Sequence, residues 1–107
     1  MKVTCVEKVK FAPGKWEDAG NLMKKFKETW KGKGLPPLKT YGCISGGDAV
    51  QTLFFVTEWD SFGAIESMME HMFADAGMKE MMLEWSKVVD SHEVSILKEL
   101  SDEELGI

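Results

Sequence analysis

Glu7 is the residue whose position in this chain most strongly indicates chemistry. It interrupts an alternating run of apolar residues that would otherwise form one face of a strand, namely Val3, Cys5, Val9 and Phe11. A carboxylate buried among apolar neighbours without a partner costs free energy or has its pKa shifted upward. Glu7 is therefore either a general base in an enclosed cavity, or a carboxylate that pairs with a lysine or lies on a wetter face.

Two histidines supply the imidazoles of the chain. His92 shares one face of a predicted strand with Val94 and Ile96, and it either takes part in catalysis or makes an ordinary hydrogen bond at a strand end. His71 falls on the polar side of a predicted helix, where a surface position is expected. The chain has no phosphate-binding glycine loop, no nucleophile elbow and no HExxH zinc motif. Glu7 and His92 are therefore the candidate catalytic residues.

Six of the eight methionines fall within residues 68–82. Thioethers bind Cu(I), but the spacing of these methionines follows a helical apolar stripe, which is typical of an adaptable core or a pliable ligand wall. Together with the four tryptophans they suit a flat hydrophobic ligand, although such residues also form ordinary cores. We expect no metal and no cofactor. The candidate ligand-binding residues are Tyr41, Trp59, Met68, Met72 and Trp85.

Charge argues against a nucleic-acid partner. All thirteen cationic residues are lysine, and the net charge is −5. Base and phosphate recognition favours the forked guanidinium of arginine, so an acidic chain without arginine is a poor nucleic-acid binder. Residues 1–39 carry ten lysines against four acids, whereas residues 40–107 carry three lysines against fourteen acids. The lysine-rich part is either a solvated helix face or a means of steering an anionic ligand.

Cysteine use and hydropathy indicate a cytoplasmic protein. Cys5 and Cys43 fall in two different predicted strands without metal-ligand spacing, and free thiols are typical of a reducing compartment. No stretch approaches the roughly 18 apolar residues of a membrane helix. The first eleven residues alternate and carry charges, unlike a signal peptide. We therefore expect no membrane partner.

Periodicity divides the chain into strands and helices. Period-two segments predict strands over residues 2–11, 38–45, 50–59 and 91–100, with a tight turn over 46–48. Apolar stripes at helical spacing predict helices over residues 15–31, from 60 or 61 to about 76, and over 78–89. We expect a single α+β domain over residues 1–100, followed by an acidic C-terminal tail over 101–107 that opens with a capping box.

The predicted element order is β-α-β-β-α-(α)-β, which is the ferredoxin-like order with a four-stranded antiparallel sheet. Right-handed, unknotted connections then place the first and third strands in the centre. Residues 53–56 of the third strand are apolar on both faces, but one helical layer covers only one face of a sheet. The other face therefore predicts a homodimer in which two sheets meet.

The segment ISGGDAVQTLFFVTEWDSFGAIESMMEHM, residues 44–72, resembles the dimeric α/β barrel superfamily. The matching features are a Gly-Gly turn, an apolar strand, and the run Glu-Trp-Asp-Ser-Phe that opens a helix. This superfamily includes antibiotic-biosynthesis-monooxygenase-like and NIPSNAP-like domains. The resemblance implies a dimeric α/β barrel with a cavity between sheet and helices. It is compatible with cofactor-free oxygenases, isomerases, dehalogenating enzymes, haem-degrading enzymes and proteins without known activity.

The haem-degrading members of that superfamily can be tested residue by residue. Aligned by the Glu-Trp-Asp-Ser segment, their Asn on the first strand falls near Glu7, their Trp near Met68, and their His near Gly77 or Met78. All three positions differ, so haem degradation by that mechanism is disfavoured. We expect a small homodimer that binds a small hydrophobic molecule between sheet and helices. The alternative is a cofactor-independent monooxygenase or isomerase acting on a small aromatic or polyketide-like substrate.

Overall fold

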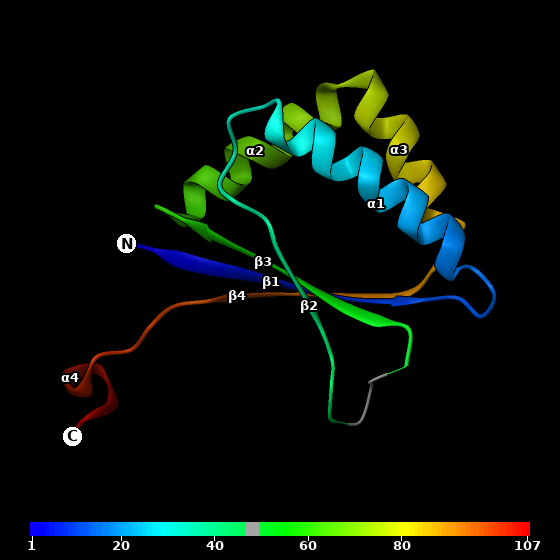
Figure 1. The fold of residues 1–107 in the computed structure, drawn as a ribbon. Helices are drawn as coiled ribbons and strands as arrows, with labels where there is room; N and C mark the ends of the chain where they lie inside the picture. The colour runs from blue at the N-terminus through cyan, green and yellow to red at the C-terminus, as the bar shows by residue number, and fades with distance from the viewer. Residues whose placement is uncertain (47–49) are drawn as a thin grey trace.

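The computed structural model describes residues 1–46 and 50–107, and it has a helical layer packed on one face of an antiparallel sheet (Figure 1). The elements in chain order are β1 (Val3–Phe11), α1 (Trp16–Lys31), β2 (Lys39–Gly42), β3 (Thr52–Trp59), α2 (Phe62–Ala74), α3 (Ala76–Ser86), β4 (Val89–Leu97) and α4 (Asp102–Leu105). The four strands lie in the order β2-β3-β1-β4, with every neighbouring pair antiparallel. This confirms the predicted ferredoxin-like fold with β1 and β3 in the centre.

Alternation along β1 builds the floor of the core. Val3, Cys5, Val9 and Phe11 point toward the helices and are buried. They belong to two clusters: one forms around Val9 and Phe11 with Ala19 and Leu22 of α1, and the other around Val3 with Trp59 and Ile65. The apolar stripe of α1 therefore packs on the centre of the sheet, as its spacing predicts.

The predicted boundaries of two strands were wrong. β2 ends at Gly42 because the chain then turns away from β3, and the Cys43 thiol donates a hydrogen bond to the Ser45 carbonyl oxygen at 3.3 Å. Part of the predicted 46–48 turn lies outside the described residues. β4 begins at Val89, where a helix was predicted, because Val89 pairs with Phe11 of β1. Pairing with a central strand outweighs the local helical pattern here.

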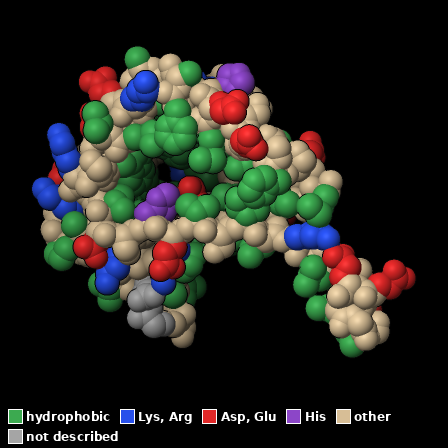
Figure 2. All heavy atoms as spheres, turned by 180° about the vertical axis from the view of Figure 1, so that it is seen from behind, with side chains coloured by type: hydrophobic (Ala, Val, Ile, Leu, Met, Phe, Trp, Pro, Cys, Tyr) green, Lys and Arg blue, Asp and Glu red, His purple; other side chains and the backbone are tan. Residues whose placement is uncertain are grey.

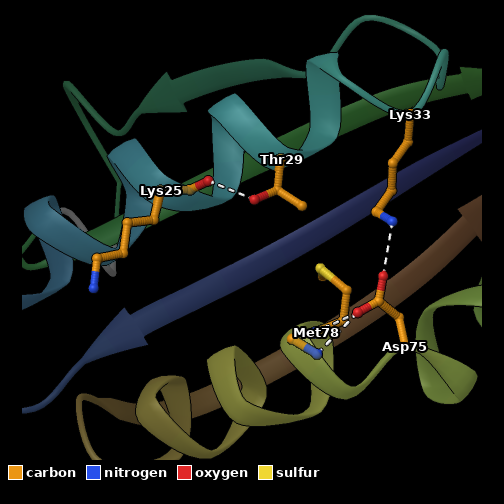
Figure 3. Close-up of polar contacts among 6 residues, drawn as sticks. Lys25, Thr29, Lys33, Asp75 and Met78 are labelled. Atoms are coloured by element: carbon orange, nitrogen blue, oxygen red, sulfur yellow. Dashed lines mark hydrogen bonds and ion pairs between the residues drawn. The ribbon is translucent and has the colours of Figure 1, made fainter.

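The break between α2 and α3 lies at Asp75 rather than at Gly77. The Asp75 carboxylate accepts hydrogen bonds from the backbone N–H groups of Gly77 and Met78 at 2.9 and 3.2 Å, which caps α3. It also accepts one from Lys33 Nζ at 3.0 Å, which ties the segment after α1 to this junction (Figure 3). The lysine holds the pKa of Asp75 below its ordinary value.

Candidate functional site

Glu7 and His92 lie side by side on the face of the sheet that carries the helices. Glu7 pairs in register with Phe55 on one side and with Val94 on the other, so the three side chains point the same way. His92 lies two residues before Val94 in β4 and pairs with Val9, so it points to the same face. The His92 Nε2 atom lies 3.4 Å from Glu7 Oε1. The two candidate catalytic residues are thus in contact.

The pair is accessible from solvent because the helices do not extend over β4. The Glu7 side chain is 37% exposed and that of His92 is 47% exposed. Every residue of β4 after Val89 is exposed, whereas Val9 and Phe55 in the central strands are buried. An uncovered edge strand beside a covered centre leaves a recess under the helical layer.

Figure 2 shows this recess from the side of the sheet edge. Hydrophobic side chains gather around a hollow between the helical layer and the sheet, and a histidine and an acidic side chain lie beside it. On β4, the exposed apolar side chains of Val94 and Ile96 share the helix-side face with His92. On α2, Met68 and Met72 are partly buried against the core cluster around Val3. The hollow therefore combines apolar walls with one carboxylate–imidazole pair.

The remaining predicted ligand-binding residues have different surroundings. Trp85 is partly buried and stacks on Phe11 at a ring-centroid distance of 5.7 Å. Trp59 is buried, and its indole N–H donates to the Thr57 hydroxyl at 2.7 Å, so it is a core residue rather than an accessible wall. The prediction that Tyr41 lines the ligand site was wrong. It pairs with Phe54 on the face turned away from the helices, so it does not line the hollow.

Sequence reasoning did not include Val94 and Ile96 among the ligand-binding residues. Their alternation with exposed polar positions on β4 indicated the face they share with His92. What the alternation could not indicate is that the helices stop short of this strand. Val94 is 53% exposed and Ile96 is 37% exposed. Apolar side chains on the sheet face that carries the helices are usually buried, so this exposure shows that the helices leave β4 uncovered.

Cys5 lies next to this site but has a different character. It is buried and pairs with Ile96 of β4 and Thr57 of β3. Burial raises the pKa of its thiol, and the negative charge of Glu7 adds to that increase. A thiol with a raised pKa is a weak nucleophile at neutral pH. Cys5 therefore belongs to the apolar floor rather than to the reactive groups.

Among the described residues, no three His, Cys, Asp or Glu side chains are placed to hold a metal ion. The described helices also include none long and apolar enough to cross a membrane.

The ferredoxin-like fold of this chain is similar to that of solved structures described as NIPSNAP family proteins and as antibiotic biosynthesis monooxygenases. A conserved protein from Methanosarcina mazei Go1 shares 22% identity with a TM-score of 0.70, and each chain is 94% covered. A NIPSNAP family protein from Agrobacterium tumefaciens shares 12% identity with a TM-score of 0.79 and 94% coverage of both chains. A putative antibiotic biosynthesis monooxygenase from Bordetella bronchiseptica shares 13% identity with a TM-score of 0.69, covering 94% of this chain and 98% of the other.

At these levels of identity, the chain is similar to these proteins in fold alone. No family model matches the sequence, and no curated protein matches it. The resemblance noted in residues 44–72 is thus matched by solved structures of both named types. A shared fold does not by itself define a function, which depends on the side chains of the site.

Proposed function

We propose that this chain binds a small hydrophobic molecule in the hollow between the helical layer and β4, over the Glu7–His92 pair. The observation that carries the proposal is the combination of exposed apolar side chains with one carboxylate–imidazole pair in a single recess. Val94 and Ile96 would contact the apolar body of the ligand. The pair would orient it through a polar group, because ligand sites commonly combine apolar walls with a few convergent polar atoms.

The hydrogen-bonding capacity of the Glu7–His92 pair limits which polar group the ligand can carry. An ionised carboxylate is an acceptor only, whereas imidazole can donate or accept at each ring nitrogen. A hydroxyl group on an otherwise apolar ligand could therefore donate to Glu7 or bond to His92, whereas a carbonyl group could only accept from His92. A flat aromatic or alicyclic molecule with one such group fits both the walls and the pair.

Fluorescence of the neutral dye Nile red tests the binding proposal. We expect saturable enhancement with the wild-type chain and loss of at least about tenfold in affinity in Val94→Ser/Ile96→Ser, because each change removes apolar contact area. Leu83→Ser is the matched control, since Leu83 is an exposed apolar residue of α3. Equal dye affinity in wild type and the β4 variant would exclude the hollow as the binding site.

A second candidate function is cofactor-independent oxygenation or isomerisation of a small aromatic or polyketide-like substrate. Two observations favour it: the 3.4 Å contact between Glu7 and His92, and the fold shared with a protein described as a putative antibiotic biosynthesis monooxygenase. Both reaction classes can begin by removing a proton from a carbon or hydroxyl activated by a carbonyl group. A carboxylate beside an imidazole can accept that proton and return it elsewhere.

We also propose that the chain acts as a homodimer that joins the sheet faces turned away from the helices. On this face, Val6, Phe54 and Val56 lie in adjacent register positions. Within the described residues α1, α2 and α3 all lie on the other side of the sheet (Figure 1). Lys8 and Glu93, which pair in register, and Lys39 and Glu58 place both signs of charge on the same face. A surface with both signs around an apolar centre suits a two-fold contact with itself.

The same proposal includes a cytoplasmic location and no nucleic-acid partner. The two cysteines are free, in keeping with a reducing compartment. The absence of arginine from the sequence disfavours phosphate recognition. Cell fractionation with an epitope-tagged full-length chain tests the location.

A further inference from the structure

The last ten residues, 98–107, form an arm that leaves the end of β4 and carries α4 away from the sheet. In Figure 1 the arm projects beyond the sheet, on the side opposite α1, α2 and α3, and the reverse view of Figure 2 shows the same placement. Every residue of the arm is exposed. The arm thus extends toward the space below the open sheet face.

The arm is held in a defined shape by its own polar contacts. Ser101 and Glu104 form a reciprocal capping box, and Lys98 pairs with the Glu104 carboxylate, which lowers the pKa of Glu104. Gly106 ends the helix in the left-handed region at φ 76°. A helix of four residues is nevertheless marginal in water, because too few backbone hydrogen bonds offset the ordering of its first turn. Packing against another surface would stabilise it.

Three apolar residues of the arm are available for such packing. Leu100, Leu105 and Ile107 are 51%, 54% and 85% exposed. Three exposed branched side chains within ten residues give the arm apolar area that another surface could bury.

Charge indicates what the arm contacts. Glu99, Asp102 and Glu103 make it strongly acidic and exposed. Lys10 and Lys39 are exposed at strand positions that face away from the helices. An acidic arm is repelled by anionic lipid or nucleic acid and attracted to the lysines that this face presents beside Glu58 and Glu93. The face in question is the one that the proposed homodimer joins.

We propose that the arm of each copy clasps the open sheet face of a second copy of this chain. Leu100, Leu105 and Ile107 pack on that copy, and the acids of α4 lie near its Lys10 and Lys39. This inference rests on the proposed homodimer and adds the segment that holds the two copies together. Exchange of arms would lengthen the interface beyond the facing sheets and slow dissociation.

Sedimentation equilibrium across a dilution series of the full chain tests the clasp. We expect Leu100→Ser/Leu105→Ser/Ile107→Ser to raise the dimer dissociation constant by about tenfold or more. Phe62→Ser/Met69→Ser/Leu83→Ser is the matched control, since it removes three exposed apolar side chains from the helical layer, and its dissociation constant should equal that of wild type. A wild-type chain that stays monomeric refutes the homodimer itself. If wild type dimerises and the arm variant has the same dissociation constant, the clasp is refuted and the homodimer is not.

A charge exchange distinguishes a second copy from the arm's own sheet. Asp102→Lys/Glu103→Lys reverses the arm, and Lys10→Glu/Lys39→Glu reverses the face. Each variant alone should dimerise more weakly than wild type, because like charges then meet at both contacts. An equimolar mixture should recover the wild-type affinity, since both contacts in the mixed dimer again join opposite charges. A mixture that stays as weak as its components, or variants as tight as wild type, would overturn the proposal.

Discussion

Glu7 and His92 meet across the two adjacent strands β1 and β4. The Glu7 Oε1 and His92 Nε2 atoms are 3.4 Å apart, and both side chains remain accessible to a ligand. The sequence singled out both residues, because Glu7 breaks an apolar strand face and His92 lies on one. It could not show that they touch, since strand register is set by the whole sheet rather than by either segment.

Replacing Glu7 by Gln keeps the shape of the side chain and removes its charge. If the site catalyses proton transfer, we expect turnover of a carbonyl-activated aromatic substrate to fall about 10²–10⁴-fold, while Nile red affinity stays within about twofold. Oxygen uptake and substrate isomerisation, followed by chromatography, measure the two reaction classes. Loss of dye binding together with turnover would assign Glu7 a role in structure or binding rather than in proton transfer.

The two thiols should differ in reactivity. Cys5 is buried with a raised thiol pKa, whereas Cys43 is less buried. We expect a disulfide reagent at pH 8 to modify Cys43 at least about tenfold faster than Cys5, and to count two thiols per chain after denaturation without reductant. Because the folded pKa of Cys5 is raised, its contribution to stability is complete below the unfolded value near 9.0 and declines as pH rises through the folded value. Equal rates in the folded chain would contradict the packing of Cys5.

At the scale of elements, hydropathy predicted the strands and helices but not where tertiary pairing changes them. The alternation of β1 and the stripe of α1 are strong patterns, and both were placed correctly. Val89 continues the helical stripe of α3 yet belongs to β4, because it pairs with Phe11. The three helices do not extend over β4, and this leaves the hollow open. How far they extend depends on their lengths and packing, so no local sequence pattern predicts it.

Asp75 is the residue that fixes the junction of α2 and α3. We expect Asp75→Ala to lower the melting temperature by about 4–8 °C, because α3 loses its cap and Lys33 loses its partner. Asp75→Asn should lower it less, since an amide oxygen can still cap the helix. The lowered pKa of Asp75 means that its contribution is present above the ordinary carboxyl value of 3.8 and is lost as pH falls through the lower folded value.

Calorimetry of both Asp75 variants at pH 7 and pH 2.5 measures this contribution. The difference between Asp75→Ala and wild type should shrink at the lower pH as the carboxylate is protonated. An undiminished difference at pH 2.5 would contradict the role of the charged carboxylate.

At the scale of the whole molecule, the open sheet face and the arm both point to association. We expect a mass of about 24 kDa, twice the chain mass of 12.0 kDa, in light scattering at micromolar concentration. The buried interface should be at least the roughly 1,600 Å² of a standard stable complex. Val6→Lys/Val56→Lys, which places like charges at the centre of the open face, should yield a folded monomer. A dimer that tolerates both lysines would show that another surface is used.

The central claim is that a small hydrophobic ligand binds over Glu7 and His92. Methyl nuclear magnetic resonance of the full chain, titrated with 1-naphthol, tests it most directly. The account predicts saturable shifts of the Val94, Ile96, Met68 and Met72 methyl groups with one dissociation constant, while the Leu83 methyls on the exposed part of α3 remain unmoved. Shifts confined to other residues, or no saturation at the solubility limit of 1-naphthol, would contradict it.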